Sequence, residues 1–468
     1  MDISKYKHWS TALNSGKKRP AYLLIPDLIS DDIDNEVLVP RERLPTVREL
    51  ASFLSLDYTT VARAFKEARH QGLIESSPRS GSFVKGNMRS LKLRDGSDFE
   101  MTMNLPPEPE SNKLAVKINN AINNLSNRHD LKSMFRYQDF GGSDYVKKAG
   151  VEFIARVIDK PNEDQLLVCP GIHSALVGLL SMLAGQGNTV CVQSLVYPGL
   201  KAIAAQLGVK LVSVDSDAQG PIIYKLEALY QTEKISALYL NPTLQNPTTE
   251  TISLKRRKQI AKLAMHYSIP IIEDDPYALL PDTPISPIYN FAPELTYYIT
   301  GLSKCFGAGL RTAYLYTPVS GSVGKKVAGA LRSLFVMASP LTNAVSADWI
   351  NDGTVDHAIN AIRKETKLRH ALAEKYLADF LISDDRDVFH VWVRIPTKVE
   401  MNPSVLATHL REHGVNAVSS AAFCTDNNPP QALRIGLGGA LSRDECAKSL
   451  QLLSKVFENP LHLTNVTL

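Results

Sequence analysis

After residue 102, short apolar runs rich in β-branched residues alternate with longer segments of helical periodicity. Examples are LLVCP (166–170), VKLVSVD (209–215), ISALYLNP (235–242), IPIIEDDPY (269–277) and RTAYLYTP (311–318). Short strands that alternate with amphipathic helices are typical of a parallel sheet covered by crossover helices. Near the end, VFHVWVRIP (388–396) and ALRIGLGG (432–439) predict the strands of a smaller unit that a final helix closes. Residues 102–468 are therefore predicted to form an α/β fold with a smaller α+β unit.

The first part of the chain has a different pattern. At 468 residues the chain is longer than one hydrophobic core usually serves. Residues 1–86 are rich in helical patterns, and the polar, basic segment KGNMRSLKLRDGSDFEM follows them at 85–101. Such a composition is typical of a linker. We expect a first domain at 1–86, a linker at 87–101 and a second domain at 102–468.

Two short helices joined by a tight turn are predicted between residues 46 and 70. Thr46 is placed to cap the first helix, and Glu49 is placed to complete a capping box. The turn SLD ends at Asp57, a suitable N-cap for the second helix. One face of that helix is apolar at helical periodicity and consists of Val61, Ala64, Phe65 and Ala68. This pattern predicts an α-rich helix-turn-helix.

The opposite face of the second helix is polar, and SPRSGSFV (77–84) predicts a small hairpin, or wing, with Arg79 at its tip. Any surface helix has a polar face, so this feature alone identifies no function. The charges are also segregated, because residues 27–36 carry only acids whereas residues 41–48 carry three arginines. Such segregation favours a face that meets a polyanion. The residues predicted to contact DNA are Arg48, Tyr58, Thr59, Thr60, Arg63, Arg79 and Gly81.

The segments RLPTVRELA, TTV and GLIESSPRSGSFV together resemble the winged helix-turn-helix of the GntR family. The resemblance covers the whole helix-turn-helix and wing, and it implies binding to an operator in double-stranded DNA. Tyr58 stands where this family often has arginine.

A lysine and an arginine flank the glycine-rich loop in TGLSKCFGAGLR (300–311): Lys304 and Arg311. Upstream, IIEDDPY supplies Asp274 and Tyr277 at the end of a predicted strand, and QNPTT supplies Asn246. These groups match the needs of pyridoxal phosphate. This cofactor requires an amine for its aldehyde, a carboxylate for its ring nitrogen, and cations with N–H groups for its phosphate.

Further candidates for the same cofactor lie along the chain. Gly171 opens a predicted helix, so the N–H groups near Ile172 and His173 are placed to hold a phosphate. Tyr197 offers a ring for stacking, and Arg434 in an apolar strand suits the carboxylate of an effector. The predicted cofactor-binding residues are Lys304 (the Schiff-base, catalytic lysine), Asp274, Tyr277, Asn246, Tyr197, Ser303, Arg311, Ile172 and His173. Each motif is weak alone, and their joint order in the chain carries the prediction.

With QNPT, DDPY and SK…GLR in this order, residues 102–468 resemble a fold-type I, class I aminotransferase. The resemblance implies a homodimer in which a tyrosine of the partner subunit reaches the phosphate, and Tyr137 in FRYQDFGG is the candidate. Three positions depart from the family pattern. Gly301 replaces a frequent hydroxyl residue, Ala308 a proline and Thr249 a glycine. These departures predict inefficient turnover.

A GntR-type winged helix joined to an aminotransferase-like domain resembles the MocR subfamily of regulators. This resemblance implies a homodimeric transcriptional regulator that senses pyridoxal phosphate, an amino compound, or both. It also implies control of vitamin B6 or of amino-acid and amine metabolism, without efficient catalysis. Two alternatives remain open: an active aminotransferase with an accessory DNA-binding domain, and a DNA-binding protein whose large domain is an inactive scaffold without cofactor.

Other features narrow the setting. The five cysteines have no CxxC spacing, so buried free thiols are expected and no metal site is predicted. No apolar run approaches the roughly 20 residues that a membrane-spanning helix needs. A cytoplasmic protein without a membrane partner is expected.

Overall fold

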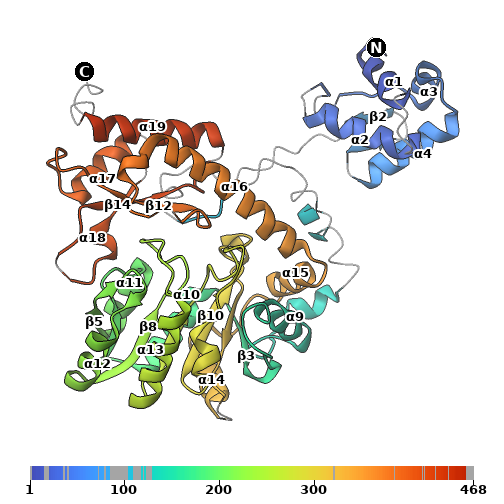
Figure 1. Cartoon of the computed structure of the whole chain (residues 1–468). Helices are drawn as coiled ribbons and strands as arrows, with labels where there is room; N and C mark the ends of the chain where they lie inside the picture. The colour runs from blue at the N-terminus through green and yellow to red at the C-terminus, as the bar shows by residue number, and fades with distance from the viewer. Residues whose placement is uncertain are drawn as a thin grey trace. The chain divides into compact units, whose positions relative to one another are not determined.

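The computed structural model describes residues 3–14, 20–34, 37–38, 42–71, 73–77, 81–84, 104–108, 117–119, 121–122, 129–319, 322–383, 385–413, 415, 417–426, 428–440 and 442–459. The chain divides into two compact units, residues 1–96 and residues 97–468 (Figure 1). The predicted linker at 87–101 lies outside the described residues.

The N-terminal unit is a helical module with a two-stranded wing, which confirms the predicted class. Its elements are η1 (Ile3–Tyr6), α1 (Lys7–Asn14), α2 (Ala21–Asp34), α3 (Val47–Leu54), α4 (Tyr58–His70), β1 (Ile74–Ser77) and β2 (Gly81–Val84). Thr46 forms the predicted capping box with Glu49 at the start of α3. Asp57 occupies the N-cap position of α4, but its side chain makes no cap hydrogen bond there. The wing strands β1 and β2 pair antiparallel, and Arg79 lies outside the described residues.

The acidic run of the N-terminal unit is partly structural. Asp32 is buried and accepts hydrogen bonds from Nε1 of Trp9 at 2.8 Å and Nε2 of His8 at 2.7 Å. Burial of an acid requires such partners. Asp32 therefore joins α1 to α2, and it adds nothing to the segregated surface charge inferred from the sequence.

The larger unit is built on a seven-stranded sheet of order β3-β11-β10-β9-β8-β4-β5. Its strands are β3 (Leu166–Cys169), β4 (Thr189–Gln193), β5 (Lys210–Val214), β8 (Ile235–Leu240), β9 (Ile271–Asp274), β10 (Thr296–Gly301) and β11 (Ala313–Tyr316). The predicted parallel sheet with crossover helices is present, and it is mixed because β11 runs antiparallel to both β10 and β3. The connection from β10 to β11 holds only the short η4 (Ala308–Leu310) and no crossover helix, so the chain reverses direction there.

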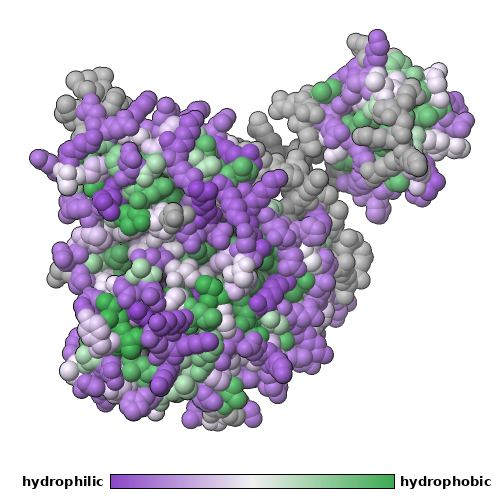
Figure 2. Space-filling view, in the orientation of Figure 1, coloured by the Kyte–Doolittle hydropathy of each residue, from purple (hydrophilic) through white to green (hydrophobic). Residues whose placement is uncertain are grey.

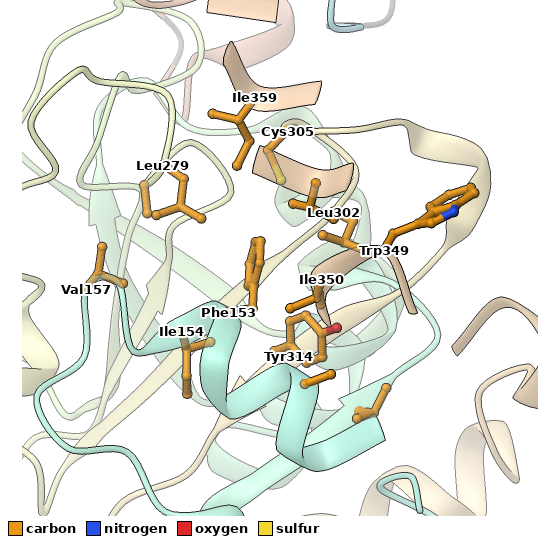
Figure 3. Packing of buried hydrophobic residues seen from close by; sticks show 14 of the residues in the cluster. Phe153, Ile154, Val157, Leu279, Leu302, Cys305, Tyr314, Trp349, Ile350 and Ile359 are labelled. Carbon is orange, nitrogen blue, oxygen red and sulfur yellow. The ribbon is translucent and has the colours of Figure 1, made fainter. Parts of the chain in front are cut away.

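Helices cover both faces of this sheet. They are α9 (Asp144–Ile154), α10 (Ile172–Leu183), α11 (Pro198–Leu207), α12 (Ile223–Thr232), α13 (Leu254–Tyr267), α14 (Val323–Phe335), α15 (Pro340–Asn351) and α16 (Thr354–Leu377). Leu167 and Cys169 of β3 pack with α10, α11 and α14, whereas Leu166 and Val168 pack with α9 and α15. In this second cluster the rings of Phe153 (α9) and Tyr314 (β11) lie 5.4 Å apart (Figure 3). The alternation shows a sheet buried on both faces.

A smaller subdomain completes the larger unit, as predicted. Its three-stranded sheet has the order β12-β14-β13, and its elements are β12 (His390–Arg394), α17 (Pro403–Glu412), β13 (Ala417–Ser419), α18 (Ser420–Phe423), β14 (Ala432–Gly436) and α19 (Arg443–Glu458). The minor elements of the unit are α8 (Leu131–Met134), η2 (Glu163–Gln165), β6 (Ser216–Asp217), β7 (Gly220–Pro221), η3 (Ile288–Phe291) and η5 (Ala378–Phe380). Arg434 lies at the middle of β14, paired with Trp392 of β12.

The surface is mainly hydrophilic, and the cysteines lie in the interior. Hydrophilic residues dominate the visible face, with apolar patches between them (Figure 2). All five cysteines are buried free thiols, as expected. Among the described residues, no helix is both long and apolar enough to cross a bilayer.

Candidate functional site

A pocket of about 380 Å³ lies between the large sheet and the smaller subdomain. Its lining includes ten of the residues predicted from the sequence: Ile172, His173, Tyr197, Asn246, Asp274, Tyr277, Ser303, Lys304, Arg311 and Arg434. They come from the loop after β8, from the end of β9 and the turn that follows it, from the connection between β10 and β11, from the starts of α10 and α11, and from β14. Carboxyl ends of parallel strands meet at one edge of a sheet, which explains why positions so distant in the chain converge.

Asp274 is the last residue of β9, and only one of its two carboxylate oxygens has a hydrogen-bond partner among the described residues. Its Oδ2 accepts a hydrogen bond from the hydroxyl of Tyr239 at 2.7 Å, and its Oδ1 is buried without a hydrogen-bond partner among the described residues. Burial raises the pKa of Asp274 to about 7, and the neighbouring Asp275 acts in the same direction. A protonated ring nitrogen placed at Oδ1 would supply the missing donor and positive charge.

Lys304 projects from a turn that the core anchors. Leu302 and Cys305, on either side of the lysine, are buried in the cluster that also holds Phe153 and Trp349 (Figure 3). The Nζ atom of Lys304 donates a hydrogen bond to the backbone carbonyl of Asn104. Burial, followed by the charge of Arg434, lowers the pKa of Lys304 to about 8. A lysine that loses its proton this readily is suited to react as an amine.

Arg311 and the start of α10 form the second end of the pocket. Gly171 is the N-cap of α10 with a φ of 90°, and a Cβ atom there would lie 2.7 Å from the guanidinium of Arg311. Only glycine therefore permits this close approach. Desolvation and the charge of Arg311 lower the pKa of His173. A cation beside free helix N–H groups suits a phosphate, and Ser303 adds a hydroxyl to the lining.

Four polar residues of the lining are joined in two hydrogen-bonded pairs. The hydroxyl of Tyr277 accepts a hydrogen bond from Nδ2 of Asn104 at 2.8 Å. Arg434 donates to Oδ1 of Asn246 at 3.5 Å, and its guanidinium lies 5.7 Å from the ring centroid of Phe423. Burial lowers the pKa of Arg434 to about 10, so it remains a cation at neutral pH.

The role of Tyr137 at the phosphate of a partner subunit stays a prediction. Tyr137 is 87% exposed and does not line the pocket of its own chain. Sequence reasoning missed Asn104, Asn241, Tyr239 and Phe423. Asn241 donates to the backbone carbonyl of Asp274 at 2.8 Å and accepts from the backbone N–H of Asn246 at 3.0 Å. The asparagine of LNP right after a strand was the available signal for Asn241.

The N-terminal unit presents most of its predicted DNA-contacting residues on the surface. Arg48, Tyr58, Thr59 and Arg63 are exposed, and Thr60 and Gly81 are half-buried. The guanidinium of Arg63 lies 3.7 Å from the ring centroid of Tyr22 on α2, so a cation–π contact orients it on the outward face of α4.

Two family models match the chain. Residues 100–453 match "Aminotransferase class I and II", and residues 21–84 match "Bacterial regulatory proteins, gntR family". The chain belongs to the class I and II aminotransferase family. It joins this domain to a GntR helix-turn-helix domain, the arrangement of MocR proteins.

Relatives share this length and arrangement. The HTH-type transcriptional regulator YdeF of Bacillus subtilis is 29% identical over 96% of this chain and 97% of its own. YjiR of Escherichia coli, another HTH-type transcriptional regulator, is 20% identical over 90% and 95%. Among solved structures, an α-aminoadipate aminotransferase of Thermus thermophilus covers 78% of this chain and 92% of its own, with 19% identity and a TM-score of 0.69. The last likeness shows the aminotransferase fold.

The pocket of this aminotransferase-family domain fits pyridoxal phosphate, which the chain binds. The open Oδ1 of Asp274 matches the ring nitrogen, the amine of Lys304 matches the aldehyde, and the cradle at Gly171 and Arg311 matches the phosphate.

Asp274→Asn should flatten the pH dependence of stability in the cofactor-free protein. The folded protein keeps Asp274 protonated up to about pH 7, whereas the unfolded chain loses that proton near the ordinary aspartate pKa of 3.8. The folded state then binds more protons between these values, so the free energy of unfolding falls as pH rises. Asparagine cannot ionise, so the variant should not lose the free energy of unfolding, on the order of 2 kcal/mol, that the wild-type protein loses between pH 5 and pH 8.

The measurement is urea unfolding of the larger unit within the full chain at pH 5 and pH 8. Exposed Asp379 serves as the control, because Asp379→Asn should keep the wild-type pH dependence. If Asp274→Asn kept the wild-type pH dependence of the free energy of unfolding, burial would not be raising the pKa of this carboxylate.

Proposed function

We propose that this protein is a MocR-type transcriptional regulator that binds operator DNA and senses pyridoxal phosphate, an amino compound, or both. The observation that carries the proposal is the joining of an exposed recognition helix, α4, and a cofactor-shaped pocket in one chain. Relatives named as HTH-type transcriptional regulators span both parts at nearly full length. Control of vitamin B6 or of amino-acid and amine metabolism, in the cytoplasm, fits ligands of this chemistry.

Different residues of the pocket are assigned to the different chemical groups of the cofactor and of an effector. Pyridoxal phosphate, when bound, supplies an electrophilic aldehyde carbon and a ring that withdraws electrons. Lys304 supplies the amine, Asp274 holds a proton at the ring nitrogen, and Tyr197 covers the ring. Arg311, Ser303, Ile172 and His173 hold the phosphate, while Tyr277 and Asn246 face the ring oxygen. Arg434 is left to bind the carboxylate of an effector.

DNA recognition is assigned to the N-terminal unit. Thr59 and Arg63 on α4 are exposed where base edges would be read, and Arg48 lies on the surface of α3. Tyr58, Thr60, Gly81 and Arg79 contribute contacts near the helix start and the wing.

A homodimer completes the proposal. Tyr137 is 87% exposed, neighbouring Phe135 is 81% exposed, and Tyr137 lies outside its own pocket. An exposed aromatic pair is unusual on a monomer and suits an interface. In this arrangement Tyr137 of each subunit reaches the phosphate held by the other.

A second candidate is an active aminotransferase with an accessory DNA-binding domain. The pocket holds an amine, a buried carboxylate and a buried arginine together. A segment of 116 residues is also 40% identical to an aromatic amino acid aminotransferase of Schizosaccharomyces pombe, over 24% of each chain.

Lys304→Ala should abolish the visible absorption band that covalently held pyridoxal phosphate gives to the protein. Alanine removes the amine while the surrounding turn stays anchored by Leu302 and Cys305. The measurement is an absorption spectrum of protein loaded with the cofactor, with circular dichroism to verify folding. Lys255→Ala, which removes an exposed lysine on α13 outside the pocket lining, is the control and should keep the band. A wild-type spectrum in Lys304→Ala would assign the cofactor to another residue.

Arg63→Ala should lower specific DNA affinity by about 1 to 3 kcal/mol if the arginine reads a base. Arg63→Lys keeps the charge and loses the planar fork, so it should retain non-specific binding and still lose specificity. Fluorescence anisotropy with the upstream region of the protein's own gene and with a scrambled duplex, at several salt concentrations, measures both effects. Lys255→Ala on α13 controls for net charge. Unchanged affinity for every duplex would exclude α4 as the reading helix.

Amino acids should give at most a slow single turnover. A Cβ at Gly301 would lie 2.7 Å from the carbonyl oxygen of Thr312, so no side-chain hydroxyl can join the phosphate site there. Misplacement of a cofactor by about 1 Å can cost on the order of a hundredfold in rate. Stopped-flow absorbance with a panel of amino acids and a 2-oxo acid acceptor tests this. Arg434→Gln should remove the response to amino acids and preserve the response to amines without a carboxylate. Sustained turnover at about 1 per second or faster would favour the aminotransferase.

A further inference from the structure

Residues 104–108 cross the edge of the pocket as a short segment, which we call the strap. It is the first described part of the larger unit, and it lies beside β12 in Figure 1. Asn104 and Leu105 line the pocket, and Asn104 is only 4% exposed. The chain ahead of the strap leads to the N-terminal unit, so the strap is the end of the larger unit nearest in sequence to the DNA-binding helices.

The backbone of Asn104 holds Lys304. The carbonyl oxygen of Asn104 accepts a hydrogen bond from Nζ of Lys304, at a site where the lysine is partly removed from water. An amine that condenses with an aldehyde gives up two N–H hydrogens, which leave with the aldehyde oxygen as water. The lysine nitrogen therefore cannot keep this bond unchanged while it is bonded to another carbon. The strap and the cofactor compete for Lys304.

The side chain of Asn104 holds two further pocket groups. Its Nδ2 donates to the hydroxyl of Tyr277 at 2.8 Å and lies 2.9 Å from Nδ1 of His390. Burial shifts the pKa of His390 well below its usual value, so the ring is neutral and Nδ1 is free to accept. Because the Tyr277 hydroxyl accepts from Asn104, its own proton is left for the pocket. Asn104 thus sets the direction of the Tyr277 proton.

The next residue fixes the strap to the smaller subdomain. A Cβ atom at Gly438, just after β14, would lie 1.8 Å from the carbonyl oxygen of Leu105. Backbone therefore packs directly on backbone, and any side chain at position 438 would push the strap away. Through Tyr277, Lys304, His390 and Gly438, the strap contacts both the large sheet and the smaller subdomain.

We infer that Asn104 is a positioning residue that orients Tyr277 and holds the free amine of Lys304, and that the strap loosens when the cofactor takes Lys304. The inference rests on the proposed function, because it needs pyridoxal phosphate at Lys304. It adds an element, the strap, whose contacts change when the cofactor binds Lys304. In sequence the strap lies close to the predicted linker that leads to the DNA-binding unit. The energy available is the differential strength of the strap's contacts in the two states.

The test uses the full-length protein with a spin label at position 108. Glu108 is exposed and all five native cysteines are buried, so Glu108→Cys offers one reactive thiol. Saturation with pyridoxal phosphate should increase the mobility of this label. In the Lys304→Ala background the label should already be mobile without cofactor, and added cofactor should change it little. A label at Lys255→Cys on α13 is the control and should not respond.

Two further variants keep the test decisive. Gly438→Ala should make the label mobile at all cofactor concentrations and remove the effect of the cofactor on DNA affinity, while the visible band persists. Asn104→Ala should shift the pH at which that band titrates, because the proton of Tyr277 is no longer directed. If the visible band forms but the mobility of the label at position 108 does not change, the inference that the strap loosens is wrong, while the proposed function is unaffected. Loss of the band in otherwise wild-type protein would instead overturn the proposed function.

Discussion

The burial of three consecutive acids at the end of β9 is the constraint on which the site depends. Glu273 accepts hydrogen bonds from the backbone N–H groups of Ile288 and Tyr289 at 2.7 and 2.9 Å, whereas burial raises the pKa of Asp275 against the opposing charge of the nearby guanidinium of Arg257. Asp274 has a hydrogen bond to only one of its oxygens, from Tyr239. A buried carboxylate is costly unless a cation or donors meet it. The pocket therefore offers a buried carboxylate oxygen without a hydrogen-bond partner among the described residues, and a protonated ring nitrogen would supply both a donor and a positive charge.

The end of the pocket at Gly171 and Arg311 depends on the close approach of a side chain to the backbone. Arg311 adopts a left-handed conformation with a φ of 50° and places its guanidinium against Gly171, where any side chain would collide. Antiparallel β11 brings this arginine back to the sheet edge, since the chain reverses directly after the lysine turn. The same reversal closes the space at Gly301. The approach of Arg311 to Gly171 and the exclusion of a side chain at position 301 thus both follow from the antiparallel direction of β11.

Much of this architecture was predictable because periodicity and motif order are local properties of the sequence. The apolar runs predicted the strands, and the order of the motifs that contain Asp274, Lys304 and Arg311 predicted a shared cofactor site. The direction of β11 was not predictable, because an apolar run of four residues looks the same in either orientation. Asn104 was missed because MTMNLPP carries no periodic pattern, and its importance arises from contacts with residues up to 286 positions away. The burial of Asp32, within the acidic run at 27–36, was not predicted because its partners, His8 and Trp9, precede it in another helix.

Hydrogen bonds join the smaller subdomain to the rest of the larger unit beside the pocket. Lys201 on α11 donates to the backbone carbonyls of Ala421 and Ala422 at 3.4 and 3.0 Å, and the backbone N–H of Thr425 donates to the carbonyl of Ser194 at 3.0 Å. These contacts fasten the smaller subdomain beside the pocket, to which it contributes Arg434 and Phe423. A ligand shifts a conformational equilibrium only as far as it binds the two states unequally. A compound with an amine for the Lys304 side and a carboxylate for Arg434 bridges both subdomains, whereas a simple amine touches one. Under the proposed function, amino acids are therefore the class best able to move the joint, and the cofactor alone acts through Lys304 and the strap.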